Sequence, residues 1–502
     1  MSDVHSLTAI AMGIDTHQEP VVFMRADCEV CRAEGFNANT RIQVGLGDCT
    51  IIATLNVVTE SVLPPEHIGF SHIAWQRMAL KGGERVRVSH APVLHSMSAV
   101  RKKIYGHTLS SREIHDIVAD IAAHRYSDMQ IASFITAGVD SLNTQEIIAL
   151  TEAMVASGKR LRWPGQTKLV DKHCIGGVPG NRTTPIVVAI ASAAGLIMPK
   201  TSSRAITSPS GTADTMEVLT RVRLSLSQIQ DTVRQVNGCL AWGGAVNLSP
   251  ADDMLIRIEH ALDIDGIGQL VASVLSKKLA AGSTHVLIDI PVGPTAKVRN
   301  QREARHLATL FDTVGLALGL EMRCLITNGE QAIGYGIGPA QEAQDILAVL
   351  HNETQAPVDL YERSIFIAAN LLSLAGQETL EAADTRARNI LASGQAWQQF
   401  KRICDAQGGL KQIPQAACQL ELGARHSGTL LAMDNRRLAR LAKLAGAPIS
   451  PAAGLRLHAK LGQALARGQP LFTLYADSQG ELDYAASYYA DNHDLFMIGE
   501  AP

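Results

Sequence analysis

The spacing of hydrophobic and polar positions changes along the 502-residue chain. Residues 1–93 hold short runs in which apolar and polar residues alternate, with glycine and proline between them, as in RIQVGLGDCTIIATLNVV. Successive side chains of a strand point to opposite faces, so this pattern is typical of half-buried strands. We expect a β-rich, barrel-like N-terminal domain over residues 1–93.

The spacing then becomes helical over residues 94–163. Ser110 lies three residues before Glu113, and Asn143 lies three residues before Glu146. A short polar residue followed at this distance by a carboxylate is the capping-box signal of a helix start. We predict a helical domain here, joined by the segment from about 245 to 280.

Strand-like and helix-like segments alternate over residues 164–339, beginning with TKLVDKH, TTPIVVAIASAAGLI and, later, THVLIDIPV. Such alternation favours an α/β domain built on a largely parallel sheet. Residues 340–502 open with helical spacing and end with GLRLHAKLGQALARGQPLFTLYAD, which alternates and is interrupted by glycines. The predicted fold class is therefore α/β multidomain, ending in a C-terminal α+β domain.

Composition narrows the classes of partner. Hydrophobic residues make up 46% of the chain and charged residues 19%, with a net charge of −3, which is an ordinary globular balance. Lysine and arginine are spread along the chain, and no apolar run is long enough to cross a bilayer. We expect a cytoplasmic protein that acts on a small molecule, with neither nucleic acid nor membrane as a partner.

The eight cysteines are scattered except for Cys28 and Cys31. This spacing differs from the dense framework of a disulfide-stabilised secreted domain, so reduced thiols are expected. The pair could supply half of a zinc site, but no second pair with suitable spacing follows. We therefore predict no metal site.

The first segment with chemical potential is residues 171–184, DKHCIGGVPGNRTT, which we call the cradle. It joins a strand end, a glycine loop and a helix start. Glycines let backbone N–H groups approach an anion, and the helix start adds partial positive charge and two threonine hydroxyls. The cradle fits phosphate, although it is neither a Walker A loop nor a dinucleotide fingerprint. A purely structural glycine turn is the alternative.

The second segment is residues 200–214, KTSSRAITSPSGTAD, which we call the hydroxyl loop. It contains seven hydroxyl side chains and one arginine. These groups are hydrogen-bond donors suited to an anionic, hydroxyl-rich ligand such as a sugar phosphate. The alternative is a solvated loop of serines and threonines.

Taken together, the two segments resemble the signature of the thymidine phosphorylase family, in which D-K-H-S-x-G-G-V is followed by S-x-R and G-T-x-D. The resemblance covers about residues 95–500 and continues through ASVLSKK (272–278) and THVLIDIPVGP (284–294). Within the family, IGGVPGN, SSRAITS and GTADTMEVL are most similar to AMP phosphorylases, which also carry an additional N-terminal β domain. The resemblance implies a helical domain that faces an α/β domain across a cleft.

The resemblance also implies roles for individual residues. His173 falls at a catalytic or sugar-contacting position, and Asp265 would be the proton donor, provided that burial raises its pKa. A histidine that merely closes a strand, and a helix-capping role for either Asp263 or Asp265, are the alternatives. The implied phosphate-binding residues are Lys172, Thr184, Ser202 and Thr212. The implied nucleotide-binding residues are Gly177, Ser203, Arg204, Ala205, Ile206, Thr207, Ser208, Thr212, Ser273 and Lys297.

Three positions depart from the pyrimidine nucleoside enzymes. Cys174 replaces the usual serine of the signature, and a thiol is a poorer hydrogen-bond donor than a hydroxyl. Ile258, with Arg257 beside it, stands where those enzymes carry an arginine that reads a pyrimidine carbonyl. Lys297 replaces an aromatic residue, whereas Ser273 and Lys277 remain as in those enzymes.

These departures put the phosphorolysis of AMP first, giving adenine and ribose 1,5-bisphosphate, with thymidine or another pyrimidine nucleoside as the alternative. A non-catalytic ligand-binding or assembly protein is a further alternative. A phosphoribosyltransferase would need acidic magnesium ligands, and the sequence has no such cluster. No cofactor is expected, because phosphate itself is a substrate. We expect a homo-oligomer, a dimer or larger.

Overall fold

The computed structural model describes residues 6–59, 61–205, 208–376 and 378–500. The chain forms two compact units, one of residues 1–153 with 254–266 and one of residues 154–253 with 267–502. Ile206 and Thr207, both predicted to bind the nucleotide, lie outside the described residues. The boundaries expected at 93, 163 and 339 stay predictions.

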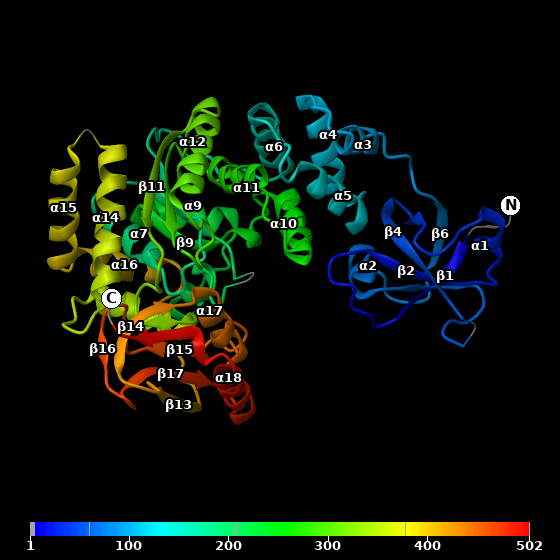
Figure 1. The fold of residues 1–502 in the computed structure, drawn as a ribbon. Helices are drawn as coiled ribbons and strands as arrows, with labels where there is room; N and C mark the ends of the chain where they lie inside the picture. The colour runs from blue at the N-terminus through cyan, green and yellow to red at the C-terminus, as the bar shows by residue number, and fades with distance from the viewer. Residues whose placement is uncertain (1–5, 60, 206–207, 377, 501–502) are drawn as a thin grey trace. The chain divides into compact units, whose positions relative to one another are not determined.

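The N-terminal part of the first unit is a closed barrel with the strand order β1-β5-β2-β4-β3-β6, drawn in blue in Figure 1. Apolar side chains such as Leu55, Ile68 and Phe70 fill its interior and are fully buried. The prediction of a barrel-like domain is therefore confirmed. Its elements are β1 (Ser6–Ala11), β2 (Val21–Arg25), α1 (Glu29–Glu34), β3 (Arg41–Leu46), β4 (Cys49–Val58), β5 (His67–Phe70), α2 (His72–Arg77) and β6 (Arg85–His90).

Helices follow the barrel, and both predicted caps are present. The side chain of Ser110 accepts from the backbone of Glu113, whose carboxylate in turn accepts from the backbone of Ser110. Asn143 and Glu146 exchange the same pair of bonds, each 3.0 Å long. The helices are α3 (Met97–Ile104), α4 (Ser111–Ala122), α5 (Asp128–Gly138), α6 (Thr144–Ser157) and α10 (Pro250–Leu262), of which α6 and α10 each have residues in both units.

The second unit contains the parallel sheet. Strand β10 (His285–Val292) lies between β7 (Val170–Cys174) and β11 (Glu321–Asn328), and all three run parallel. Strands β8 (Met198–Ser202) and β9 (Gly238–Trp242) form a parallel pair that a bridge between Leu169 and Ile197 joins to β7. The remaining elements around this sheet are α8 (Thr212–Leu219), α9 (Leu226–Val236), η1 (Gly243–Ala245), α11 (Ile267–Ala280) and α12 (Gln301–Ala317).

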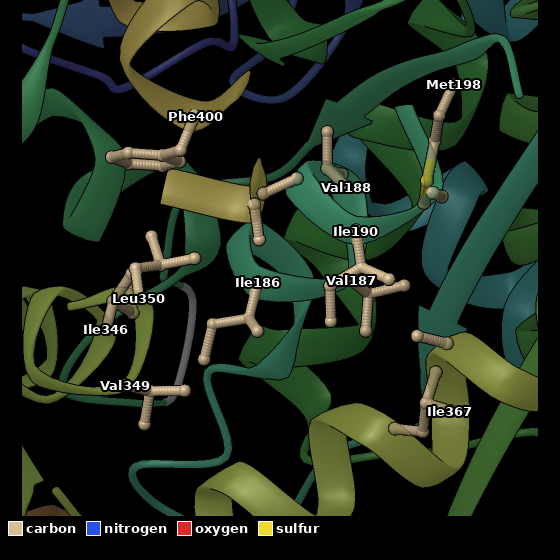
Figure 2. Close-up of a cluster of buried hydrophobic side chains, with 14 of the residues drawn as sticks. Ile186, Val187, Val188, Ile190, Met198, Ile346, Val349, Leu350, Ile367 and Phe400 are labelled. Atoms are coloured by element: carbon tan, nitrogen blue, oxygen red, sulfur yellow. The ribbon is translucent and has the colours of Figure 1, made fainter. Parts of the chain in front are cut away.

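Helix α7 (Thr183–Ala193) is buried along nearly its whole length and forms the centre of the core. Helices α13 (Pro339–Leu350), α14 (Val358–Ala375), α15 (Leu380–Ala392) and α16 (Gln395–Ala406) surround it. Figure 2 shows this packing, with Ile186, Val187, Val188 and Ile190 of α7, and with Ile346, Val349, Leu350, Ile367 and Phe400 from the surrounding helices. The start of α7, which belongs to the cradle, is thus fixed by an apolar core.

The C-terminal part, orange and red in Figure 1, is α+β as predicted. One sheet has the order β12-β15-β17-β13 and the other β16-β14-β18. No helix among the described residues is long and apolar enough to cross a membrane. The elements are β12 (Gly336–Ile337), β13 (Cys418–Gly423), β14 (Gly428–Met433), α17 (Asn435–Leu444), β15 (Gly454–Leu457), β16 (Ala464–Leu465), β17 (Pro470–Ala476), α18 (Gln479–Asp491), η2 (His493–Leu495) and β18 (Phe496–Gly499).

Candidate phosphate-binding site

Lys172 lies on β7, beside the start of α7. Its side chain is fully buried, and Nζ donates to the hydroxyls of Thr183 at 2.7 Å and Thr184 at 3.2 Å. Burial lowers the pKa of Lys172, because the surrounding protein replaces the water that would solvate an ammonium group. Both hydrogen-bond partners are neutral hydroxyls, which do not compensate the positive charge of an ammonium group. A bound anion would therefore stabilise this ammonium.

The glycine loop bends between Lys172 and α7 through left-handed backbone. Gly176, Gly177 and Gly180 have φ values of 96°, 81° and 69°, which glycine adopts without strain. A Cβ atom on Gly177 would overlap the backbone nitrogen of Lys297, so the close approach of these two segments also requires glycine there. The loop therefore packs directly against the segment that carries Lys297.

The hydroxyl loop presents two of its predicted ligands at element ends. Ser202 ends β8, and its hydroxyl is buried with no hydrogen-bond partner among the described residues. Thr212 is the first residue of α8. The carboxylate of Asp214 caps the start of this helix by accepting from the backbone N–H of Gly211 at 2.9 Å. A buried hydroxyl without a partner is costly unless a ligand completes it, so Ser202 is a candidate contact.

Arg204 is tied into the same loop. Its guanidinium donates to Asp214 at 2.9 Å and to Glu217 at 2.8 Å, and it lies over the ring of Trp242, 4.8 Å from the ring centre. Ser203 and Ser208 are exposed. The loop thus combines a fixed arginine with exposed serines, of which Ser208 donates its hydroxyl to the carbonyl of Ser210 at 3.0 Å.

Asp171, the first residue of the cradle, belongs to a cluster of buried charged side chains. Asp171 accepts from Lys278 at 2.8 Å and pairs with Lys200 at 3.2 Å, and all three side chains are almost fully buried. Burial opposes ionisation of Asp171, but the two ammonium groups hold its pKa below the usual value. Burial lowers the pKa of Lys278 to about 7.

His173 follows Lys172 on β7. Its pKa lies well below the usual value because of burial, with Lys278 and Lys200 adding repulsion, although the residue as a whole is only partly buried. The imidazole is therefore neutral at physiological pH. It can donate or accept a hydrogen bond but does not bring a positive charge of its own.

Cys174 ends β7 opposite Asp289 of β10. Burial, with the carboxylate of Asp289, raises the pKa of Cys174 to about 12, so the thiol stays protonated. Asn181 donates to its sulfur at 3.4 Å, and Asp289 accepts from the hydroxyl of Thr327 at 2.6 Å. The thiol hydrogen remains a weak donor at the position where the family signature has a hydroxyl.

Ser273 and Lys277 lie one turn apart on α11. Lys277 approaches the hydroxyl of Ser273 at 3.4 Å and forms a 2.6 Å ion pair with the buried carboxylate of Asp252. The pair presents a cation and a hydroxyl on the same face of the helix.

Asp265 belongs to the first unit, in the connection between α10 and α11. Asp265 is exposed, because the short connection after Leu262 leaves its carboxylate at the surface. The sequence-based expectation that this carboxylate is buried is therefore wrong. Nearby on α10, Ile258 is buried, and Arg257 donates to both carboxylate oxygens of Asp128, at 2.6 and 2.5 Å. Arg257 is thus already paired within its own unit.

The sequence did not indicate several charged residues of this site. Asp289 had one signal, because it interrupts the apolar run HVLIDIPV on a strand that is buried on both sides. Arg182 was present in the cradle motif without a role, and its partner Glu342 lies 160 residues away. Among the described residues, no group of three or more His, Cys, Asp or Glu side chains is arranged to hold a metal ion.

Comparison with known proteins agrees with this architecture. The chain matches the glycosyl transferase family, helical bundle domain, over residues 97–158, and the glycosyl transferase family, a/b domain, over residues 166–397. Residues 429–495 match the pyrimidine nucleoside phosphorylase C-terminal domain. The fold and site therefore define a glycosyltransferase built from these domains.

The relatives define the family more narrowly. A protein from Polaromonas sp. named "Putative thymidine phosphorylase" is 53% identical, with 99% of this chain and 97% of the relative covered. "Putative thymidine phosphorylase 1" from Acidovorax sp. is 52% identical over 98% of this chain and 97% of the relative. The chain belongs to the thymidine/pyrimidine nucleoside phosphorylase family.

Solved structures show the shared fold at much lower identity. Anthranilate phosphoribosyltransferase from Thermus thermophilus is 18% identical with a TM-score of 0.52, covering 62% of this chain and 99% of that one. The enzyme from Saccharomyces cerevisiae is 15% identical with a TM-score of 0.51, covering 63% and 98%. This likeness concerns the fold alone.

Proposed function

We propose that this protein cleaves the N-glycosidic bond of a pyrimidine nucleoside with inorganic phosphate, with thymidine as the first substrate to test. The products would be thymine and 2-deoxyribose 1-phosphate. The observation that carries the proposal is the buried ammonium of Lys172, whose hydrogen bonds go to Thr183 and Thr184 at the start of α7. The names of the full-length relatives support the same choice and favour it over AMP.

The chemistry has two requirements. Breaking the bond between sugar and base develops positive charge on the sugar ring and negative charge on the departing base. Phosphate held by Lys172, Thr184, Ser202 and Thr212 would attack the anomeric carbon and stabilise the ring cation. The buried hydroxyl of Ser202, which has no protein partner among the described residues, supports its part in this set.

The departing base needs a hydrogen bond or a proton. Lys277, which forms an ion pair with Asp252, and Ser273 offer donors of the kind that a pyrimidine carbonyl accepts. We keep Asp265 as the proposed proton donor, which requires that substrate binding remove its carboxylate from water. Neutral His173 would contact the sugar or base through a hydrogen bond. Gly177, the run from Ser203 to Ser208 and Lys297 would line the remainder of the nucleotide site.

A nucleoside 5′-monophosphate, with AMP first, is the second candidate. It is favoured by Lys297, a cation whose backbone packs against Gly177 of the cradle. It is also favoured by Ile258, which is buried and cannot donate to a pyrimidine carbonyl. The paired state of Arg257 points the same way, because its guanidinium is held by Asp128.

A substrate panel tests the proposal. Purified protein is incubated with phosphate and thymidine, uridine, AMP, CMP or UMP, and the released base is quantified. The proposal expects the highest kcat/KM on thymidine or uridine, with release dependent on phosphate. Faster release from AMP would restore the monophosphate as the substrate, and no release from any compound would leave a binding or assembly function instead.

Lys297→Ala separates the two candidates. If Lys297 contacts a 5′-phosphate, its removal costs a charge-assisted hydrogen bond of roughly 1.5–3 kcal/mol, which is about 10–150-fold in kcat/KM on AMP. Activity on thymidine, which has no 5′-phosphate, would then change little. Equal losses on both substrates would contradict any selective contact and assign Lys297 a general supporting role.

A further inference from the structure

Arg182 lies immediately before α7, between the glycine loop and the threonines of the cradle. Its guanidinium makes three contacts with two other segments. Nε donates to Glu342 at 2.7 Å, Nη1 donates to the hydroxyl of Thr212 at 3.0 Å, and Nη2 donates to the carbonyl of Ser210 at 2.8 Å. The arginine therefore joins the cradle to the hydroxyl loop.

Glu342 fixes the position of the Arg182 side chain. It lies in the first turn of α13, its side chain is 1% exposed, and the oxygen that accepts from Arg182 also accepts from the hydroxyl of Thr215 at 2.9 Å. A buried carboxylate paired with one guanidinium and one hydroxyl fixes the plane of the guanidinium. The direction of Nη1 toward Thr212 is thus set by α13.

The contact with Thr212 has a consequence for hydrogen-bond direction. A threonine hydroxyl has one hydrogen to donate, whereas guanidinium nitrogens only donate. The oxygen of Thr212 accepts from Arg182, and no group among the described residues accepts its hydroxyl hydrogen, so this hydrogen can be donated to a third group. An anion is the group that such a preorganised donor suits best.

We propose that Arg182 is a positioning residue that orients the hydroxyl of Thr212 toward the attacking phosphate without touching the phosphate itself. This inference rests on the proposed function, in which Thr212 is a phosphate ligand. It assigns the Arg182–Glu342 pair to the phosphate site although Glu342 lies on α13, far from the cradle in sequence. Lysine could not replace the arginine, because one ammonium cannot make these three divergent contacts.

A double-mutant cycle tests the inference. Arg182→Met, Thr212→Val and the double variant are compared by the Kd of inorganic phosphate from calorimetry and by the KM for phosphate at saturating nucleoside. Arg182 acting through Thr212 predicts that each single variant weakens phosphate binding about tenfold, and that the double variant also loses about tenfold. A loss of about 100-fold in the double variant would overturn the inference, because it would mean independent contacts.

Two further variants keep the result interpretable. Arg182→Met leaves the carboxylate of Glu342 buried without its partner, so the cycle is repeated in a Glu342→Gln background that removes this charge. Arg388→Met is the matched control and should leave phosphate binding unchanged, because Arg388 on α15 forms a surface pair with Glu362 on α14. Normal phosphate binding by Arg182→Met in both backgrounds would also overturn the inference.

The readouts separate this inference from the proposed function. Absence of base release by the wild-type protein would contradict nucleoside phosphorolysis, while the calorimetric cycle still reports on Arg182 and Thr212. A KM for the nucleoside that stays within about twofold in Arg182→Met is expected, because the positioning role concerns phosphate alone. An increase in both KM values by the same factor would indicate general distortion and contradict a positioning role.

Discussion

The N-terminal barrel and the α/β part of the second unit are both built on apolar strands, but they differ in where they keep charge. Among the described residues of the barrel, the buried polar side chains are Ser6, Thr54 and Ser71, and no charged side chain is buried. Around the cradle, by contrast, buried charges are concentrated. They are Asp171, Lys172, Lys200, Asp214, Lys278, Asp289 and Glu342.

The difference teaches where to look for function. Removing a charge from water costs several kcal/mol unless partners compensate it, and apolar packing of the same volume would often be at least as stable. The barrel buries apolar side chains and no charged one among its described residues, as expected for a domain whose interior serves stability alone. Burying charge around the cradle costs stability, and Lys172, whose hydrogen bonds go to two neutral hydroxyls, is a charge that a bound anion would compensate further.

Lys172→Met should have the largest effect that this comparison predicts. It removes the ammonium but keeps an unbranched side chain of similar length, so kcat/KM should fall about 10²–10³-fold, the scale for losing one preorganised donor. The thermal midpoint should stay equal or rise, because a buried charge is replaced by an apolar group. Steady-state kinetics and calorimetric unfolding measure the two quantities.

Asp265→Asn is the companion variant. It should keep phosphate binding near the wild-type Kd while turnover falls, because the proposed proton donor does not hold phosphate. If Lys172→Met stayed within about threefold of wild type in kcat/KM, short of the expected scale, the cradle would not be the phosphate site.

Leu55→Ala and Ile190→Ala test whether loss of packing in each region affects phosphate binding. Both side chains are fully buried, one in the barrel and one on α7, and each truncation should cost about 2–5 kcal/mol of local stability. Hydrogen exchange of barrel or α7 peptides measures this cost. Only Ile190→Ala should raise the KM for phosphate, because α7 carries Thr183 and Thr184. A raised KM for phosphate in Leu55→Ala would instead connect the barrel to the site.

Local signals made much of the fold predictable. The capping pairs Ser110 with Glu113 and Asn143 with Glu146 act over three residues, so sequence spacing reveals them. The segment TTPIVVAIASAAGLI indicated a helix after the glycine loop. The pairing of Arg182 with Glu342 was not predictable in this way, because it depends on how α13 packs against α7 and α8.

Charge environment was equally hidden from the sequence. The neighbours of Asp171, namely Lys200 and Lys278, come from separate elements that meet only when the sheet and α11 assemble. Burial of Asp265 was expected from its proposed role, but the chain leaves it exposed in the connection before α11. Motif position thus predicted which residues to examine, whereas their protonation and pairing required the fold.

Cys174→Ser should have the smallest effect and sharpens the comparison at a single atom. The thiol is held next to Asp289, and its pKa of about 12 keeps it protonated, so it contributes no ionisation between pH 6 and 9. Serine donates a stronger hydrogen bond in nearly the same volume, which should tighten phosphate binding by up to about 1 kcal/mol, or roughly fivefold in Kd. The cysteine and serine proteins should also show the same pH dependence of phosphate binding over this range, since neither side chain titrates there.

Cys418→Ser, on β13 of the C-terminal sheets, is the control and should leave the Kd unchanged. Weaker binding in Cys174→Ser would mean that the larger sulfur packs against Asn181 in a way that the hydroxyl cannot reproduce, and the cradle would then owe part of its shape to the thiol.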